Sequence, residues 1–202
     1  MYSLSEQVDN FVFHLEKEGY KLFPYLPNQN WKEGDPIYYS GPYWDNQEPT
    51  AAITALLSGK WLPAGENVNK FERAFSKQFE FKHSVMVNSG SSANLVMIAA
   101  LKKYFDWKDG DEIIVCACGF PTTINPIIQA GLKPVFVDIN DDDLNWDLEQ
   151  VEAKITDRTV AAFSSPVLGN PYDFDKFLDI IDRNGLKYIA DNCDSLGSKW
   201  RG

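Results

Sequence analysis

The sequence predicts an α/β fold, a mostly parallel sheet with helices on both faces. From Ser84 onward, short apolar runs alternate with longer amphipathic segments, which is the pattern of successive βαβ units. In addition, 202 residues of which 44% are hydrophobic can bury the core of one large domain, with or without an appended segment. Ligands of such sheets bind at the carboxyl ends of the strands, so we expect function in the loops that follow the strands.

The first part of the chain, residues 1–49, differs in character from the rest. Apolar residues between Leu4 and Leu15 recur at helical spacing. A stretch crowded with Pro, Trp and Tyr follows, from Phe23 to Trp44. We interpret 1–49 as an N-terminal helix and an aromatic-rich arm, whose rings pack on the chain itself, on another subunit or at the mouth of a ligand site. Residues 50–202 are expected to form the sheet domain.

Two helices are predicted before the alternating region. The first runs from Pro49 to Ser58, because Pro suits the first turn of a helix and Gly59 ends it. The second runs from Asn67 to Phe79, where four apolar side chains recur on one helical face.

The alternating region predicts five strands and four helices. Each strand is a short apolar run, and each helix is an amphipathic segment between two strands. The expected strands are Ser84–Asn88, Glu112–Cys116, Pro134–Val137, Thr159–Phe163 and Lys187–Ala190. The expected helices are Ser91–Tyr104, Thr122–Gln129, Leu148–Lys154 and Asp173–Asn184. Right-handed crossovers between these strands make the sheet mostly parallel and place helices on both of its faces.

Charge and cysteine content argue against several classes of function. With 19 basic and 29 acidic residues the net charge is -10, which disfavours nucleic acid and an anionic membrane surface as partners. Three cysteines without disulfide-like spacing, and the lack of a basic flank with an apolar run at the N-terminus, indicate a reducing cytoplasm. Cys116 and Cys118 without a second pair make a poor metal site, so no metal is expected.

The run Ser89-Gly90-Ser91-Ser92-Ala93-Asn94 lies between an apolar stretch and a helix-periodic stretch. The start of a helix exposes backbone N–H groups and the positive end of the helix dipole, so it favours a phosphate group. Gly90 lets the backbone approach the anion closely, and the serine hydroxyls add donors. No lysine follows as in a nucleotide P-loop. The alternative is that Ser91 or Ser92 only caps the helix.

Two further loops follow predicted strands and carry chemically suggestive residues. Phe120 comes after the second strand, and Asp191 comes directly after the last one. Together with the phosphate site, a flat ring and a carboxylate at one sheet edge suit a phosphorylated aromatic cofactor whose ring nitrogen is protonated. Taken singly, Phe120 is more typical of a core residue, Asp191 of a turn cap, and Asp194 of a solvated surface acid.

Three sequence runs occur in this order: NSGSSAN, GDEIIVCACGFPTTINPIIQAGLKPVFVDI and IADNCDSLGSKWRG. Together they resemble the DegT-type family of sugar aminotransferases, which depend on pyridoxal phosphate (PLP). The resemblance covers Ile53 to Gly202 and is strongest to the branch of CDP-4-keto-6-deoxyglucose 3-dehydrases. It implies the large domain of the aminotransferase fold type I.

The resemblance also implies roles for residues at matching positions. Gly90 and Ser91 would bind the cofactor phosphate, Phe120 would stack on the pyridine ring, and Asp191 would pair with the ring nitrogen. Asp194 stands where many relatives have His or Gln near the phenolic oxygen of the cofactor. An acid at that position fits the dehydrase branch better than ordinary aminotransferases.

In the family, the catalytic Lys, or His in the dehydrase branch, follows the last of these runs and precedes a smaller C-terminal domain. The resemblance therefore implies that this chain is a truncated N-terminal portion, inactive in isolation, with the catalytic residue beyond Gly202. The cysteine ligands of the iron–sulfur cluster that serves the dehydrase branch would also lie beyond Gly202. No residue of the chain is assigned a catalytic role.

As a whole, the resemblance implies 3-dehydration of a CDP-4-keto-6-deoxyhexose with PLP or pyridoxamine phosphate, in deoxysugar or lipopolysaccharide synthesis in the cytoplasm. The expected partners are the nucleotide sugar, a second copy in a homodimer of the full-length form, and a reductase. One alternative is an aminotransferase that makes an amino sugar. Another is a non-catalytic remnant or binding subunit. A dinucleotide-binding domain is disfavoured because no G-x-G-x-x-G run is present.

Overall fold

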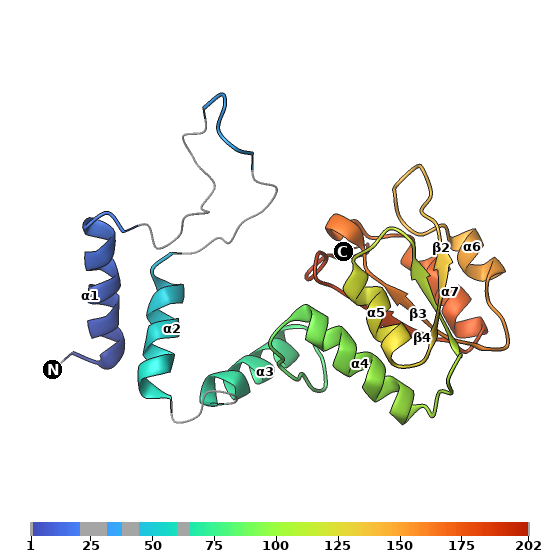
Figure 1. Cartoon of the computed structure of the whole chain (residues 1–202), viewed down its shortest axis with the longest axis horizontal. Coiled ribbons are helices and arrows are strands. Elements are labelled where there is room, and N and C mark those ends of the chain that lie inside the picture. Colours follow the sequence, from blue (N-terminus) through green and yellow to red (C-terminus); the bar gives the residue numbers. More distant parts are fainter. Residues whose placement is uncertain (1, 21–31, 38–44, 60–64, 202) are drawn as a thin grey trace. The chain divides into compact units, whose positions relative to one another are not determined.

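The computed structural model describes four stretches of the chain, residues 2–20, 32–37, 45–59 and 65–201 (Figure 1). The chain divides into two compact units, Met1–Met86 and Val87–Gly202. This division differs from the one predicted from the sequence, 1–49 and 50–202, which stays a prediction. Most of the predicted aromatic-rich arm, Phe23–Trp44, lies outside the described residues.

The first unit begins with two helices that pack on each other, α1 (Leu4–Lys17) and α2 (Gln47–Ser58). The hydroxyl of Ser3 accepts a hydrogen bond from the Glu6 N–H, and the Glu6 carboxylate accepts one from the Ser3 N–H. This capping box fixes the start of α1. Val12 of α1 is fully buried. Both helices confirm the sequence prediction.

A third helix, α3 (Glu66–Gln78), also confirms its prediction, but the strand predicted at Ser84–Asn88 is wrong. The Met86 N–H donates to the Glu72 carboxylate of α3, at 2.8 Å, instead of to a neighbouring strand. Val85 is 80% exposed. Within the described residues no strand pairs with this segment, and an apolar run without a partner strand cannot form a ladder.

The second unit contains a sheet of four parallel strands in the order β2-β1-β3-β4. All five residues of the central strand β1 are buried, as expected for a parallel strand covered on both faces. Each strand lies within one residue of its predicted range. The bounds are Glu112–Cys116 for β1, Lys133–Val137 for β2, Thr159–Ser164 for β3 and Lys187–Ala190 for β4.

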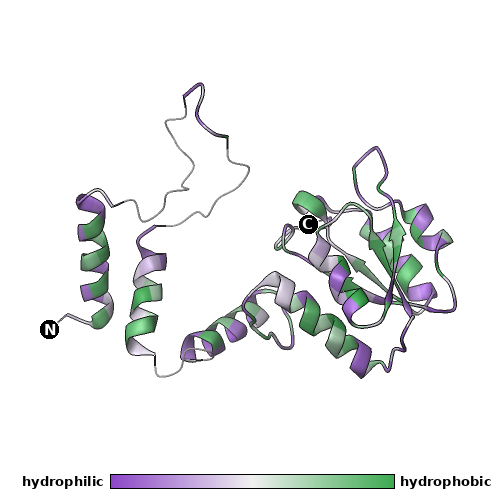
Figure 2. Cartoon of the chain, in the orientation of Figure 1, coloured by the Kyte–Doolittle hydropathy of each residue, from purple (hydrophilic) through white to green (hydrophobic). Residues whose placement is uncertain are grey.

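Helices cover both faces of this sheet, which confirms the predicted layers (Figure 1). Ile113 of β1 lies in a core cluster with residues of α4 (Gly90–Tyr104) and α5 (Pro121–Gln129). Its neighbour Ile114 lies in a second cluster, with residues of α6 (Leu148–Ala153) and α7 (Phe174–Arg183), because successive strand residues point to opposite faces of the sheet. In Figure 2 the strands are coloured mainly green, which marks hydrophobic residues. A short 3-10 helix, η1 (Val167–Gly169), follows β3.

None of the helices in the described stretches combines the length and the hydropathy needed to span a bilayer.

Candidate functional site

Three elements of the second unit meet around the carboxylate of Asp191. Asp191 follows β4 directly, and its own N–H donates to the Ser164 carbonyl of β3 at 2.8 Å. Asn94, in the second turn of α4, donates from Nδ2 to Asp191 Oδ2 at 2.7 Å. The hydroxyl of Thr123, in the first turn of α5, donates to the same oxygen at 2.9 Å. The carboxylate thus joins the starts of α4 and α5 to the end of β4.

The Asp191 carboxylate is buried with neutral donors only. Its residue is 9% exposed, and its second oxygen, Oδ1, accepts the Cys193 N–H at 3.2 Å. Within the described stretches, no lysine, arginine or histidine forms an ion pair with it. A buried carboxylate is costly without a cationic partner. A ligand that brings a positive N–H group would therefore be bound favourably here.

The start of α4 offers backbone donors to an anion. Ser89 caps the helix, and its hydroxyl accepts the Ser92 N–H at 3.1 Å. The N–H groups of Gly90 and Ser91 belong to the first turn and have no partner within the helix. Both residues are exposed. The residue that caps the helix is thus Ser89, and the capping alternative considered for Ser91 and Ser92 is wrong.

Phe120 presents its ring to solvent at the start of α5. It is 66% exposed, so the alternative that it is a core side chain is wrong. Its backbone is extended, at φ -84° and ψ 141°, and Pro121 opens the helix behind it. The ring and Thr123 belong to the same helix start, so the ring is carried by an element that also holds Asp191.

Asp194 is placed differently from the other predicted site residues. It is exposed, and its carboxylate accepts the Leu168 N–H of η1 at 3.4 Å. Among the hydrogen bonds of the described residues, none joins Asp194 to Asp191, Asn94 or Thr123. The structure therefore brings together the elements that carry Gly90, Ser91, Phe120 and Asp191, and it places Asp194 further along the loop that begins with Asp191, bonded to η1.

Sequence reasoning assigned no role to Asn94 and Thr123. Both are 4% exposed, although each is polar and lies inside a helix. An Asn in a helix interior is unfavourable unless its amide finds a partner, and this was the available signal.

Sequence reasoning also missed a group of three hydroxyls, from Ser164, Tyr172 and Tyr188, which meet at the end of β3. The Tyr172 hydroxyl donates to Ser164 Oγ at 2.8 Å, and Ser164 Oγ lies 3.1 Å from the Tyr188 hydroxyl. Ser164 is fully buried and Tyr172 is 1% exposed. Burial raises the pKa of Tyr172 far above its ordinary value, so this hydroxyl remains neutral. The three hydroxyls join the end of β3 to β4, the strand that Asp191 follows.

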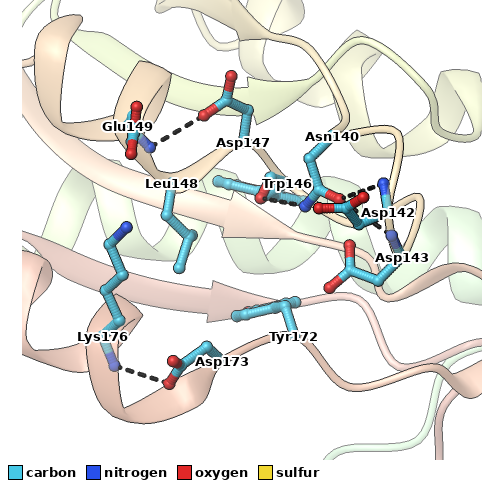
Figure 3. Close-up of a pocket in the computed structure, with 10 residues that line it drawn as sticks. All are labelled: Asn140, Asp142, Asp143, Trp146, Asp147, Leu148, Glu149, Tyr172, Asp173 and Lys176. Carbon is cyan, nitrogen blue, oxygen red and sulfur yellow. Dashed lines mark hydrogen bonds between the residues drawn. The ribbon is translucent and has the colours of Figure 1, made fainter.

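A separate cavity of about 470 Å³ lies at the carboxyl end of β2 (Figure 3). It does not include any of the predicted site residues. Its acids mainly serve local structure, because Asp147 caps α6 and Asp173 caps α7. The lining residues are Asn140, Asp142, Asp143, Trp146, Asp147, Leu148, Glu149, Tyr172, Asp173 and Lys176. We assign this cavity no part in the site.

Burial raises the pKa of the Cys116 thiol, which keeps it in the neutral form. In the part of the chain that the structure describes, no group of three or more His, Cys, Asp or Glu side chains is placed to hold a metal ion.

Residues 44–202 match the model of the DegT/DnrJ/EryC1/StrS aminotransferase family. The chain belongs to this family. It is similar to the GDP-4-keto-6-deoxy-D-mannose 3-dehydratase of Escherichia coli, with 44% identity over 157 residues, 77% of this chain and 40% of that protein. It is also similar to the lipopolysaccharide biosynthesis protein RfbH of Salmonella typhimurium, with 33% identity over 204 residues, 99% of this chain and 45% of that protein.

A solved structure of the E. coli GDP-4-keto-6-deoxy-D-mannose 3-dehydratase with bound hydrated PLP superimposes on this DegT-family chain with a TM-score of 0.74. The identity is 42%, and the match covers 81% of this chain and 42% of the other. This likeness confirms the predicted fold class of PLP-dependent aminotransferase-fold enzymes. The chain spans about two fifths of the length of the curated relatives it matches.

Proposed function

We propose that this chain forms the PLP-binding part of a nucleotide-sugar enzyme, and that Asp191 pairs with the protonated ring nitrogen of the cofactor. The observation that carries the proposal is a buried carboxylate surrounded by neutral donors only. A pyridinium N–H supplies a positive charge next to this carboxylate and donates a further hydrogen bond to it.

The residues around Asp191 fit the remaining parts of PLP. The free N–H groups of Gly90 and Ser91 suit its phosphate, since they lie at the positive end of α4. The exposed ring of Phe120 suits stacking on a flat pyridine. Both α4 and α5 are bonded through their side chains to Asp191, so the three contacts share one rigid frame.

When bound, PLP would supply an electron sink for the reaction. The chain's own residues bind and orient it. The start of α4 holds the phosphate, Phe120 limits the tilt of the ring, and Asp191 keeps the ring nitrogen charged. A protonated ring nitrogen strengthens the electron withdrawal by the ring. Asp191 therefore sets how strongly the bound cofactor acts as an electron sink.

For the reaction we propose 3-dehydration of a nucleotide-linked 4-keto-6-deoxyhexose. Support comes from the 44% identity to a 3-dehydratase and from the acid at Asp194. A CDP-linked substrate remains part of the proposal from the sequence, and the E. coli relative favours a GDP-linked one as the alternative. The competing function is transamination to an amino sugar, which the family as a whole supports. Protection of the protein against thermal unfolding by CDP-linked or GDP-linked sugar distinguishes the two nucleotides.

The proposal extends to the setting of the full-length enzyme. We propose a homodimer in the cytoplasm that works with a reductase, using pyridoxamine phosphate as the alternative cofactor form and, in the dehydrase branch, an iron–sulfur route. The likeness to RfbH supports a place in lipopolysaccharide synthesis.

A PLP titration tests the proposed site. Quenching of tryptophan fluorescence measures the dissociation constant for the wild type, Asp191→Asn and the matched control Asp182→Asn, an exposed acid of α7. A lost charge-assisted hydrogen bond corresponds to about 1.5–3 kcal/mol, so Asp191→Asn should weaken binding by roughly 10- to 100-fold. Asp182→Asn should bind like the wild type. Equal dissociation constants for all three proteins would refute the site.

A further inference from the structure

The two oxygens of the Asp191 carboxylate are not equivalent. Oδ2 accepts two hydrogen bonds, from Asn94 Nδ2 at 2.7 Å and from the Thr123 hydroxyl at 2.9 Å. A carboxylate oxygen has about two acceptor directions, so Oδ2 is fully used. Oδ1 accepts a single, longer bond of 3.2 Å from the Cys193 N–H. One acceptor direction of Oδ1 therefore remains for a ligand.

The donors on Oδ2 are themselves held in place. Asn94 and Thr123 are each 4% exposed, so both side chains are buried against neighbouring atoms. The Asn94 amide also donates to the Thr122 carbonyl at 3.2 Å, and the Thr123 N–H donates to the Phe120 carbonyl at 3.0 Å. The orientation of the carboxylate is thus set by the protein before any ligand binds, which avoids a cost of reorganisation.

We infer that Asn94 and Thr123 are positioning residues, which occupy Oδ2 so that Oδ1 accepts the N–H of the bound pyridinium. This inference rests on the proposed function, because it concerns the same site. Neither residue touches the ligand. Both act through Asp191, by fixing the plane of its carboxylate and by supplying the hydrogen bonds that its charge needs while it is buried.

The inference predicts a loss that is specific to the ring nitrogen. Without one donor, Oδ2 loses part of its stabilisation, and the carboxylate can turn so that Oδ1 no longer faces the ligand. The ring nitrogen should then lose its proton more readily, while the phosphate and stacking contacts remain. A substitution that only loosens the fold would weaken all three contacts together.

The test uses the full chain and PLP labelled with ¹⁵N in its ring. Thr123→Val and Asn94→Leu remove one donor each at similar volume. Thr123→Ser restores the hydroxyl, and Asp191→Asn gives the full loss. The matched control is Thr122→Val, the same change one residue earlier on α5, because the Thr122 hydroxyl does not bond to Asp191. For each protein, the ring nitrogen resonance is followed against pH, and the PLP dissociation constant is measured.

We expect Thr123→Val and Asn94→Leu to move the midpoint of ring deprotonation about one pH unit lower and to weaken PLP binding about tenfold. Thr123→Ser and Thr122→Val should follow the wild type. If the donor variants instead behave like Thr122→Val while Asp191→Asn shows its loss, the positioning role is refuted and the PLP site stands. If the wild type itself does not bind PLP with a protonated ring, the proposed function fails. Should Asn94→Leu fail to fold, the comparison of Thr123→Val with Thr123→Ser decides the outcome.

Discussion

The hydroxyls of Ser164, Tyr172 and Tyr188 form a buried group at the end of β3. Removal of one of them should destabilise the sheet by an amount that depends on which hydrogen-bond partners the other two retain. Tyr172→Phe removes the 2.8 Å hydrogen bond to Ser164 Oγ and the longer 3.4 Å contact with the Tyr188 hydroxyl, while Ser164 keeps its hydrogen bond to the Tyr188 hydroxyl at 3.1 Å. We expect a loss of about 1 kcal/mol. Ser164→Ala removes both bonds and leaves the Tyr172 hydroxyl only the Tyr188 hydroxyl, at 3.4 Å. We expect a loss of about 2–3 kcal/mol.

The double variant separates a network from independent bonds. Ser164→Ala already breaks the bond that Tyr172→Phe removes, and loss of the Tyr172 hydroxyl then removes a poorly paired buried group. The double variant should therefore lose about as much as Ser164→Ala alone. Urea unfolding followed by circular dichroism measures all three variants, with Tyr104→Phe at an 81% exposed position as the control. Losses that add to within about 0.5 kcal/mol would refute the coupling.

Three further predictions concern acid stability, a helix cap and the exposed ring. The Lys133 ammonium holds the pKa of buried Glu112 below its ordinary 4.5, so the stability that this carboxylate contributes is present above pH 4.5 and is lost as the pH falls further. Stability should therefore fall less steeply between about pH 5 and about pH 3 in Glu112→Gln than in the wild type, and parallel curves would contradict this. Ser89→Ala should lower the free energy of unfolding by about 1 kcal/mol, because the Ser92 N–H loses its acceptor, and Ser89→Asn should restore it. Phe120→Ala should change the free energy of unfolding by less than about 0.5 kcal/mol, whereas the same substitution of a buried Phe costs about 3–5 kcal/mol. Phe120→Ala should nevertheless weaken PLP binding.

Much of the fold was predictable because each element carries its own signal. After Glu112, residues 113–116 of β1 are apolar throughout, and the burial of this stretch on both faces follows from that alone. The strand expected at Ser84–Asn88 shows where local signals end. Its residues favour a strand, but a strand also needs a partner, and the described residues do not provide one.

The residues proposed to contact the cofactor were predictable from the sequence, and the residues that support them were not. Gly90, Phe120 and Asp191 follow from their places in the loops and from the family resemblance. Asn94 and Thr123 are 97 and 68 residues away from Asp191 along the chain. A buried polar residue in a helix indicates that a partner exists, but only the packing of α4 and α5 against the end of β4 shows which one. The exposure of Phe120 also depends on this packing, since its residue type favours the core.

A crystal structure of the chain with PLP tests the central claim most directly. The account predicts the phosphate at the N–H groups of Gly90 and Ser91, the ring against Phe120, and the ring nitrogen within hydrogen-bond distance of Asp191 Oδ1, about 2.7–2.9 Å. PLP bound elsewhere, for example in the cavity beside Lys176, or a ring nitrogen that does not face Asp191, would contradict it.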